Sequence, residues 1–263
     1  MSNIPHLVGM IHLKALPGAP GFEGSIDSVM RAALDEASLL VEAGFPALIV
    51  ENFNDVPFFA DSVPAETIAS MTCITDALVR ETGVPIGVNV LRNDALAALA
   101  IAAATGAPFI RVNILAGVMY TDQGPIVGRA AEVMRKRTEL GSHVEVWADV
   151  LVKHATPPPG MDARQATEDT LERGLADALI VSGSGTGHAP DMERLKMVRE
   201  AAGPDTRIAV GSGAEPTNFE DLAAYADTVI VGSFTKVDGD ASNPLDMARV
   251  ASVVEAAAAA GLS

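Results

Sequence analysis

The sequence predicts an α/β protein, a single (β/α)8 TIM barrel spanning residues 1–263. Three observations support this fold class. The length of 263 residues suits one complete barrel of about 250 residues. Short apolar runs alternate with helical patterns eight times, without a spare element. Hydrophobic residues make up 49% of the chain and aromatic residues only 4%, so Ala, Val, Ile and Leu must build the core, as buried parallel strands require.

Eight strands and eight helices are expected in alternation. The strands are short apolar runs with β-branched residues, predicted at 7–12, 47–51, 86–90, 109–113, 144–149, 178–182, 207–210 and 228–231. The helices are predicted at 25–43, 64–82, 94–105, 126–140, 162–174, 190–202, 216–226 and 244–260. The long strand-to-helix connections are 13–24, 52–63, 114–125 and 150–161. All four belong to the barrel face on which barrel enzymes carry out chemistry.

The first helix illustrates the evidence for these elements. Apolar residues from Ile26 to Val41 recur at helical spacing, with Ser25 placed to cap the helix and Gly44 to end it. A doubly wound sheet is the competing architecture, but it would normally carry a glycine fingerprint after the first strand. Here that strand continues into His12-Leu13-Lys14, so the barrel is preferred.

Composition argues against several classes of partner. The 18 basic and 34 acidic residues give a net charge of −16, which disfavours nucleic acid and anionic lipid as partners. The apolar run 7–11 is too short for a signal-peptide core, and the alanine-rich run 95–104 is too short for a membrane span. The single cysteine, Cys73, cannot form an internal disulfide and is expected to be a buried helical residue. We therefore expect a cytoplasmic protein without membrane insertion, and we also expect a homo-oligomer.

Small residues follow the seventh and eighth predicted strands. They are Gly211, Ser212 and Gly213 after the seventh strand, and Gly232 and Ser233 after the eighth. Backbone N–H groups at these two places can converge on a phosphate. One such step is an ordinary tight turn, but two at equivalent positions favour an anion site. The sixth strand leads into Ser182-Gly183 and a glycine-rich run to Gly187, which is either a phosphate clamp or a merely flexible connection.

Reactive side chains stand where five predicted strands should end in apolar residues. They are His12 and Lys14, Glu51 and Asn52, Asn89 and Arg92, Arg111 and Asn113, and Asp149 with Lys153 and His154. Buried charges cost several kcal/mol unless they are paired, so this pattern implies either a ligand site or a dense ion-pair network. We favour the ligand site.

Several roles are open for these side chains. Glu51 is a candidate general base, or else the partner of Arg111 in a structural ion pair. Asp149 is assigned a catalytic or sugar-binding role in preference to pure ion pairing. Lys153 is a candidate base, a Schiff-base lysine or a simple cation facing a phosphate. His12 is either an acid or base at neutral pH or a satisfied core histidine.

A metal site would need His, Asp and Glu side chains to converge. His12, Glu51, Asp149 and His154 could do so, but neither HxH nor HExxH spacing is present. We therefore assign no metal ligand and no cofactor, and we keep a divalent metal as the alternative. The loops 114–125 and 182–188 carry several glycines and are expected to close over a ligand.

Six segments in the right order resemble the BtpA family, which also includes the SgcQ proteins. They are 9–18 (GMIHLKALPG), 51–58 (ENFNDVPF), 87–94 (GVNVLRND), 109–113 (FIRVN), 149–154 (DVLVKH) and 210–213 (VGSG). The resemblance covers nearly the whole chain. It implies a ribulose-phosphate-binding type of barrel and a family name taken from a role in photosystem I biogenesis, but it implies no particular reaction.

The leading hypothesis is a cytoplasmic enzyme that acts on a phosphorylated sugar or glycosyl phosphate, as an isomerase, a lyase or a nucleosidase-like enzyme that cleaves a glycosidic bond. The glycine-serine steps would hold the phosphate, and Glu51 and Asp149 would move protons. Arg111, Lys153 and the Asn89 and Asn113 side chains would orient hydroxyls or stabilise negative charge. The alternative is a noncatalytic assembly or stability factor of the photosystem I biogenesis type, which an exposed apolar patch on the helices would favour.

Overall fold

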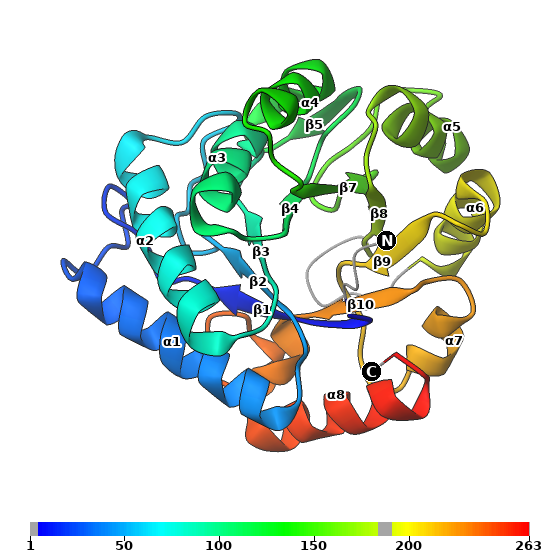
Figure 1. Cartoon of the computed structure of the whole chain (residues 1–263). Coiled ribbons are helices and arrows are strands. Elements are labelled where there is room, and N and C mark those ends of the chain that lie inside the picture. Colours follow the sequence, from blue (N-terminus) through cyan, green and yellow to red (C-terminus); the bar gives the residue numbers. More distant parts are fainter. Residues whose placement is uncertain (1–4, 184–190, 263) are drawn as a thin grey trace.

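Eight parallel strands close into a barrel, which confirms the predicted fold class (Figure 1). The computed structural model describes residues 5–183 and 191–262. Around the barrel, the strands follow the order β1-β10-β9-β8-β7-β4-β3-β2. Their bounds are β1 (Leu7–His12), β2 (Leu48–Glu51), β3 (Ile86–Asn89), β4 (Phe109–Val112), β7 (Glu145–Val150), β8 (Ala178–Val181), β9 (Arg207–Val210) and β10 (Thr228–Val231).

Helices surround the barrel (Figure 1). They are α1 (Ile26–Ala43), α2 (Ala65–Thr82), α3 (Ala95–Thr105), α4 (Ala130–Glu139), α5 (Ala163–Glu168), α6 (Met192–Ala202), α7 (Phe219–Ala223) and α8 (Met247–Ala259). The predicted cap of α1 is confirmed, because Ser25 Oγ accepts a hydrogen bond of 3.2 Å from the Ser28 N–H. The predicted stop is confirmed too, since Gly44 ends this helix with a φ of 111°, a conformation that glycine adopts without strain.

A β-hairpin interrupts the regular alternation, so the expectation of no spare element was wrong. Strands β5 (Val118–Thr121) and β6 (Gly124–Val127) pair antiparallel within the connection that follows β4. The helix predicted at 126–140 therefore begins only at Ala130. The hairpin forms because its Met119 and Ile126 side chains bury themselves against Ile114 and Val152.

Three other helices differ from the sequence prediction. The helix expected at 216–226 is the short α7, and the helix expected from residue 244 begins after Asp246, whose side chain accepts from the Ala248 N–H. The helix expected at 162–174 consists of α5 followed by a π-helical turn, Asp169–Arg173.

Cys73 is exposed, so the prediction of a buried thiol was wrong. The face of α2 that contacts the core carries Met71, Ile74 and Leu78, and this spacing turns Cys73 towards solvent.

The barrel interior is filled by side chains below the site. Phe109 and Trp147 stack with ring centroids 4.6 Å apart. Gly87 makes room for them, because a Cβ atom there would lie 2.3 Å from the Phe109 ring. The floor of the barrel is therefore a packed core, and any ligand must bind above it.

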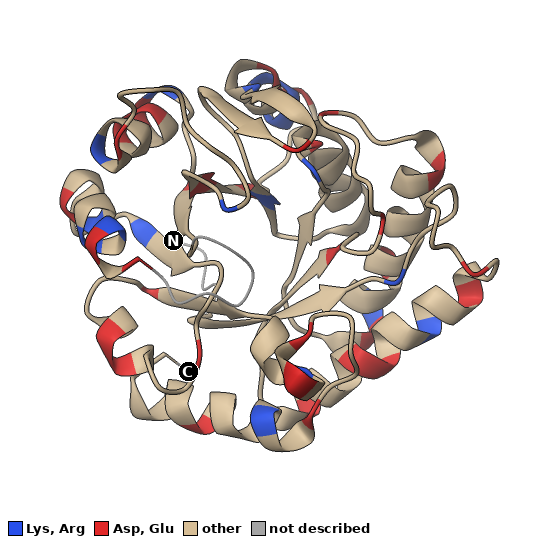
Figure 2. Ribbon diagram, turned by 180° about the vertical axis from the view of Figure 1, so that it is seen from behind, with Lys and Arg blue, Asp and Glu red and all other residues tan. Residues whose placement is uncertain are grey.

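Charged residues lie mainly on the outer helices and connections (Figure 2). None of the helices in the described part of the chain combines the length and the apolar character that a membrane span needs.

Candidate active site

The polar residues of the site follow from the alternation of side chains along the strands. On five barrel strands, a buried apolar residue of the barrel interior stands two positions before a polar residue of the site. The pairs are Met10/His12, Ile49/Glu51, Phe109/Arg111, Trp147/Asp149 and Ile180/Ser182. Since successive side chains of a strand point to opposite faces, each such pair points to the same side. His12, Glu51, Asn89 and Arg111 are also register partners on the adjacent strands β1 to β4.

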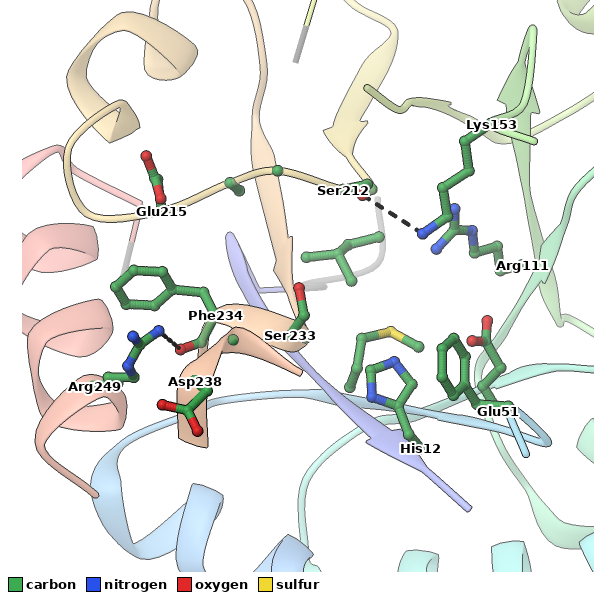
Figure 3. A pocket seen from close by; sticks show the side chains of 18 residues that line it. His12, Glu51, Arg111, Lys153, Ser212, Glu215, Ser233, Phe234, Asp238 and Arg249 are labelled. Carbon is green, nitrogen blue, oxygen red and sulfur yellow. Dashed lines mark hydrogen bonds between the residues drawn. The ribbon is translucent and has the colours of Figure 1, made fainter. Parts of the chain in front are cut away.

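A cavity of about 480 Å³ opens at this end of the barrel (Figure 3). The predicted residues that line it are His12, Glu51, Arg111, Lys153, Gly211, Ser212, Gly213, Gly232 and Ser233. The predicted residues outside its lining are Lys14, Asn52, Asn89, Arg92, Asn113, Asp149, His154, Ser182 and Gly183. The structure thus brings the two glycine-serine turns together with the predicted side chains of Glu51, Arg111 and Lys153 in a single cavity.

Asp149 forms a buried ion pair with Arg111. Arg111 donates from Nε and Nη2 to the two carboxylate oxygens, at 2.9 Å each. Ser182 Oγ donates to the same carboxylate at 2.9 Å, and Asn113 Nδ2 donates at 3.3 Å. The side chains of Arg111 and Asp149 are 3% and 0% exposed, so this pair is desolvated and fixed in place. Asp149 therefore holds Arg111 in orientation and has no direct access to the cavity.

Asn89 and Ser182 brace this ion pair. The Asn89 amide donates to the Arg111 carbonyl oxygen at 3.2 Å and to Asn113 Oδ1 at 3.3 Å. Asn89, Asn113 and Ser182 thus position the ion pair, because all three are buried and all three bond to its members or to each other.

Glu51 differs from Asp149, because no hydrogen bond or ion pair joins its carboxylate to another residue in the described part of the chain. The residue is only 7% exposed and lines the cavity. Burial raises the pKa of Glu51, and the positive charges of Arg111 and Lys153 only partly oppose this effect. A carboxylate in this state is suited to accept and return a proton.

Lys153 lies across the cavity beside the first glycine-serine turn. Its Nζ atom is 3.5 Å from Ser212 Oγ (Figure 3). Burial, followed by repulsion from Arg111, lowers the pKa of Lys153 to about 8, although Glu51 and Asp149 attract its charge. Its backbone carbonyl accepts a 2.7 Å hydrogen bond from Arg92 Nη2, which anchors the loop that carries it. The sequence placed Arg92 at a predicted strand end, but its role in anchoring this loop follows only from the contact with the Lys153 carbonyl in the folded chain.

His12 is a neutral imidazole at pH 7. Burial, followed by the positive charges of Lys236 and Lys153, lowers the pKa of His12 to about 3. Its ring packs against Phe53 at a centroid distance of 4.6 Å. Its Nδ1 atom is buried and has no hydrogen-bond partner among the described residues.

Gly211 and Gly213 of the first turn require glycine for different structural reasons. A Cβ atom on Gly211 would lie 2.4 Å from Ile180 Cγ2, so only glycine fits there, and the Gly211 N–H is already bonded to the Val181 carbonyl. Gly213 has a φ of 78°, a conformation that glycine adopts without strain. Asn218 Nδ2 donates to the Gly213 carbonyl at 2.9 Å and holds the turn in shape.

The second turn lies between β10 and a short 3-10 turn. The Thr235 N–H donates to the Gly232 carbonyl at 3.1 Å, which leaves the Ser233 and Phe234 N–H groups at the open start of this turn. A Cβ atom on Gly232 would lie 2.9 Å from His12 Cε1, so Gly232 is needed for close packing.

His154 is exposed and does not line the cavity. No three His, Cys, Asp or Glu side chains gather as a metal cluster within residues 5–183 and 191–262. The proposed ligand set of His12, Glu51, Asp149 and His154 is therefore not assembled here. Of the expected lid at 182–188, residues 184–188 lie outside the described residues.

Sequence reasoning missed several residues of the cavity wall. They include Met10, Phe53, Glu215, Phe234, Asp238 and Arg249. Phe53, Glu215 and Phe234 follow a barrel strand within a few residues, and that place in the chain was the signal that could have drawn attention to them.

The fold and the site define a TIM barrel with a polar cavity at the ends of its strands. The chain matches the BtpA family model over residues 4–259, so it belongs to the BtpA family. An uncharacterised protein of Thermococcus kodakarensis is 47% identical, over 95% of this chain and 94% of that protein. The photosystem I biogenesis protein BtpA of Synechocystis is 45% identical, over 96% of this chain and 88% of that protein.

Solved structures of low sequence identity share the fold. A native KDPGal structure has a TM-score of 0.59 at 16% identity, and the likeness covers 99% of this chain and 98% of the other. Orotidine 5′-phosphate decarboxylase from Pyrococcus horikoshii has a TM-score of 0.56 at 19% identity, covering 95% and 97% of the two chains. At such identities these likenesses establish the fold alone.

Proposed function

We propose that this protein is an enzyme that performs acid–base chemistry on a phosphorylated sugar or glycosyl phosphate. The observation that carries the proposal is the shared cavity of Glu51, Lys153 and the two glycine-serine turns. The environment raises the pKa of one acid and lowers the pKa of one base, which is the arrangement that acid–base catalysis near neutral pH needs.

The phosphate would bind at the two turns. The backbone N–H groups of Ser212, Gly213 and Ser233 are the candidate donors, and the Lys153 ammonium supplies positive charge beside Ser212. Barrels of the same fold include orotidine 5′-phosphate decarboxylase and N-(5′-phosphoribosyl)anthranilate isomerase, whose names describe phosphorylated substrates. That agreement supports the proposal at the level of fold only.

The sugar would lie over Glu51 and Arg111. Glu51 accepts a proton from the substrate, and the Lys153 ammonium returns one or stabilises the negative charge that develops. Arg111, fixed by Asp149, orients an oxygen of the sugar, and His12 acts as a neutral hydrogen-bonding group. Isomerisation, carbon–carbon cleavage and glycosidic-bond cleavage can all use such a pair, so these three reactions define the substrate panel.

A noncatalytic role in photosystem I assembly is the second candidate, because the Synechocystis relative carries that name. Large exposed apolar side chains on the helices are Leu39 on α1, Met197 on α6 and Met247 on α8. They belong to three different helices, and scattered single residues of this kind are ordinary for a protein surface. This distribution favours the enzyme.

A substrate screen tests the proposal. The panel contains aldose, ketose and glycosyl phosphates, with each dephosphorylated sugar as its control, and is read first by thermal shift and then by turnover. We expect stabilisation by at least one phosphorylated member of about 2.7 kcal/mol at a hundred times its dissociation constant. We expect turnover that falls in Glu51→Gln. Binding without turnover of any member would favour the noncatalytic candidate.

The oligomeric state is a separate part of the proposal. We propose a homo-oligomer in the cytoplasm, and light scattering during size-exclusion chromatography measures its mass against the 27.2 kDa of one chain. A mass equal to one chain at working concentration would contradict it.

A further inference from the structure

The cavity has two chemically different halves on either side of the glycine-serine turns (Figure 3). The inner half is lined by His12, Glu51, Arg111 and Lys153, and the outer half by Glu215, Phe234, Asp238 and Arg249. Ser212 and Ser233 lie between these two groups in Figure 3. The hydrogen-bond pattern agrees, because Lys153 reaches Ser212 Oγ at 3.5 Å, while Arg249 Nη1 donates to the Phe234 carbonyl at 3.3 Å.

This order means that a phosphate at the turns would stand in the middle of the cavity, with room on both sides. A phosphate at the end of a ligand would leave the outer half unused. It would also carry up to about two negative charges at pH 7. The Glu215 and Asp238 carboxylates, which line the outer half, would repel that charge. A phosphate linked to a second group on its outer side has only one ionisable oxygen, so it brings a single negative charge to the turns. A second phosphate beyond it would meet the positive charge of the Arg249 guanidinium, which lines the outer half.

The outer half offers groups that recognise a hydroxyl-bearing, planar molecule. Carboxylates such as Glu215 and Asp238 accept charge-assisted hydrogen bonds from hydroxyl groups. The Phe234 ring lines the cavity beside them, and the Arg249 guanidinium lies 5.2 Å from its centroid. An aromatic ring stacks on a nucleobase, and a ribose supplies the hydroxyls.

We propose that the ligand is a sugar whose phosphate is linked onward to a nucleoside, and that the outer half binds this nucleoside. The proposal rests on the proposed function, because it needs the phosphate at the turns and the reacting sugar in the inner half. Arg249 then faces the second phosphate of such a nucleoside diphosphate-linked sugar.

Calorimetric titration with ADP-ribose and with ribose 5-phosphate tests the proposal, since both contain the same ribose 5-phosphate unit. We expect ADP-ribose to bind at least about tenfold more tightly. We expect Glu215→Gln and Asp238→Asn each to weaken ADP-ribose binding by about tenfold while leaving ribose 5-phosphate binding unchanged or tighter. Asp238 has a φ of 57°, which asparagine tolerates, so the second variant keeps its backbone. Glu220→Gln, an exposed carboxylate of α7 outside the cavity lining, is the matched control and should alter neither affinity.

The possible failures are distinguishable. If ribose 5-phosphate binds as tightly as ADP-ribose, or if the outer variants change both affinities alike, the nucleoside subsite is wrong and the phosphate site stands. If neither compound binds, and the panel of sugar phosphates also fails, the proposed function is wrong and this inference falls with it.

Discussion

Asp149 and Glu51 are two buried carboxylates at the same end of the barrel, and their surroundings give them different roles. Asp149 accepts four hydrogen bonds, two from Arg111 and one each from Ser182 and Asn113. Glu51 has no such partner among residues 5–183 and 191–262, and it faces the cavity. The first carboxylate is neutralised by protein and the second is left for a ligand. Burial alone therefore does not mark a candidate catalytic acid, whereas burial without a partner at a cavity wall is the basis on which we propose Glu51.

Replacing Asp149 should have the largest effect, and the effect should be on stability. Asp149→Asn leaves the Arg111 guanidinium buried without its counter-charge, which should lower the free energy of unfolding by about 3 to 5 kcal/mol. Urea titration measures this loss. The control is Asp191→Asn, which changes an exposed helix cap to an equally good one and should alter stability by less than about 0.5 kcal/mol. If Asp149→Asn is as stable as its control, the distinction between the two carboxylates fails.

Replacing Glu51 should lower turnover. In free energy, this loss should be slightly smaller than the loss of stability expected for Asp149→Asn. Glu51→Gln should lower kcat/KM by about a hundredfold, because the amide cannot accept the substrate proton. The variant should be at least as stable as the wild type at pH 7, because burial raises the pKa of Glu51 and so disfavours its ionised form in the folded state. Glu81→Gln, on an exposed position of α2, provides the matched comparison. A less stable but fully active Glu51→Gln would reverse the assignment.

The pH dependence of turnover should show which protonation state of Lys153 is the active one. As an ammonium group it loses its proton near pH 8, so kcat/KM should fall about tenfold per pH unit above that pH. On the acidic side, kcat/KM should fall as Glu51 becomes protonated below its raised pKa. Lys153→Met should abolish the alkaline decline in whatever activity remains. Activity that instead rises through pH 8 would show that the neutral amine works as a base or a Schiff-base nucleophile.

The lowered pKa of Lys153 also predicts how the stability of the protein changes with pH. Its pKa in the folded protein lies below its ordinary value of 10.5, so between about pH 8 and 10.5 the unfolded chain binds the extra proton. This residue's contribution to stability should therefore rise as pH increases through that range. The difference between wild type and Lys153→Met in urea titrations at pH 8 and pH 10 isolates this contribution, and equal differences at the two pH values would contradict it.

The sequence was sufficient for the barrel and for half of the residues that line the cavity, because both depend on short-range patterns. The apolar runs located the eight barrel strands, and the residues two positions beyond the core, such as Glu51 and Arg111, followed from alternation. The partner of Arg111 was not readable, since the choice between Glu51 and Asp149 depends on how neighbouring strands are placed in space. The hairpin β5–β6 was missed for a related reason, because Met119 and Ile126 meet their apolar partner Val152 only in the folded chain.

The outer half of the cavity was also not predicted from the sequence, because its residues meet only in the folded chain. Phe234 and Arg249 are separated by fifteen residues and belong to different elements, so no local pattern joins them. The sequence left two roles open for His12, as an acid or base and as a core histidine. Burial, followed by the surrounding positive charges, lowers the pKa of His12 to about 3, which favours a neutral imidazole at pH 7.

Calorimetric titration of phosphorylated sugars tests the central claim most directly, because it asks whether the two turns bind phosphate. The wild type should bind at least one phosphorylated sugar, and its dephosphorylated counterpart should bind at least about tenfold more weakly. Ser212→Trp and Gly213→Asp should each weaken that binding by about tenfold or more while remaining folded, because bulk or negative charge would fill the amide site. Equal affinity in wild type and both variants, or equal affinity for the sugar without its phosphate, would contradict the account.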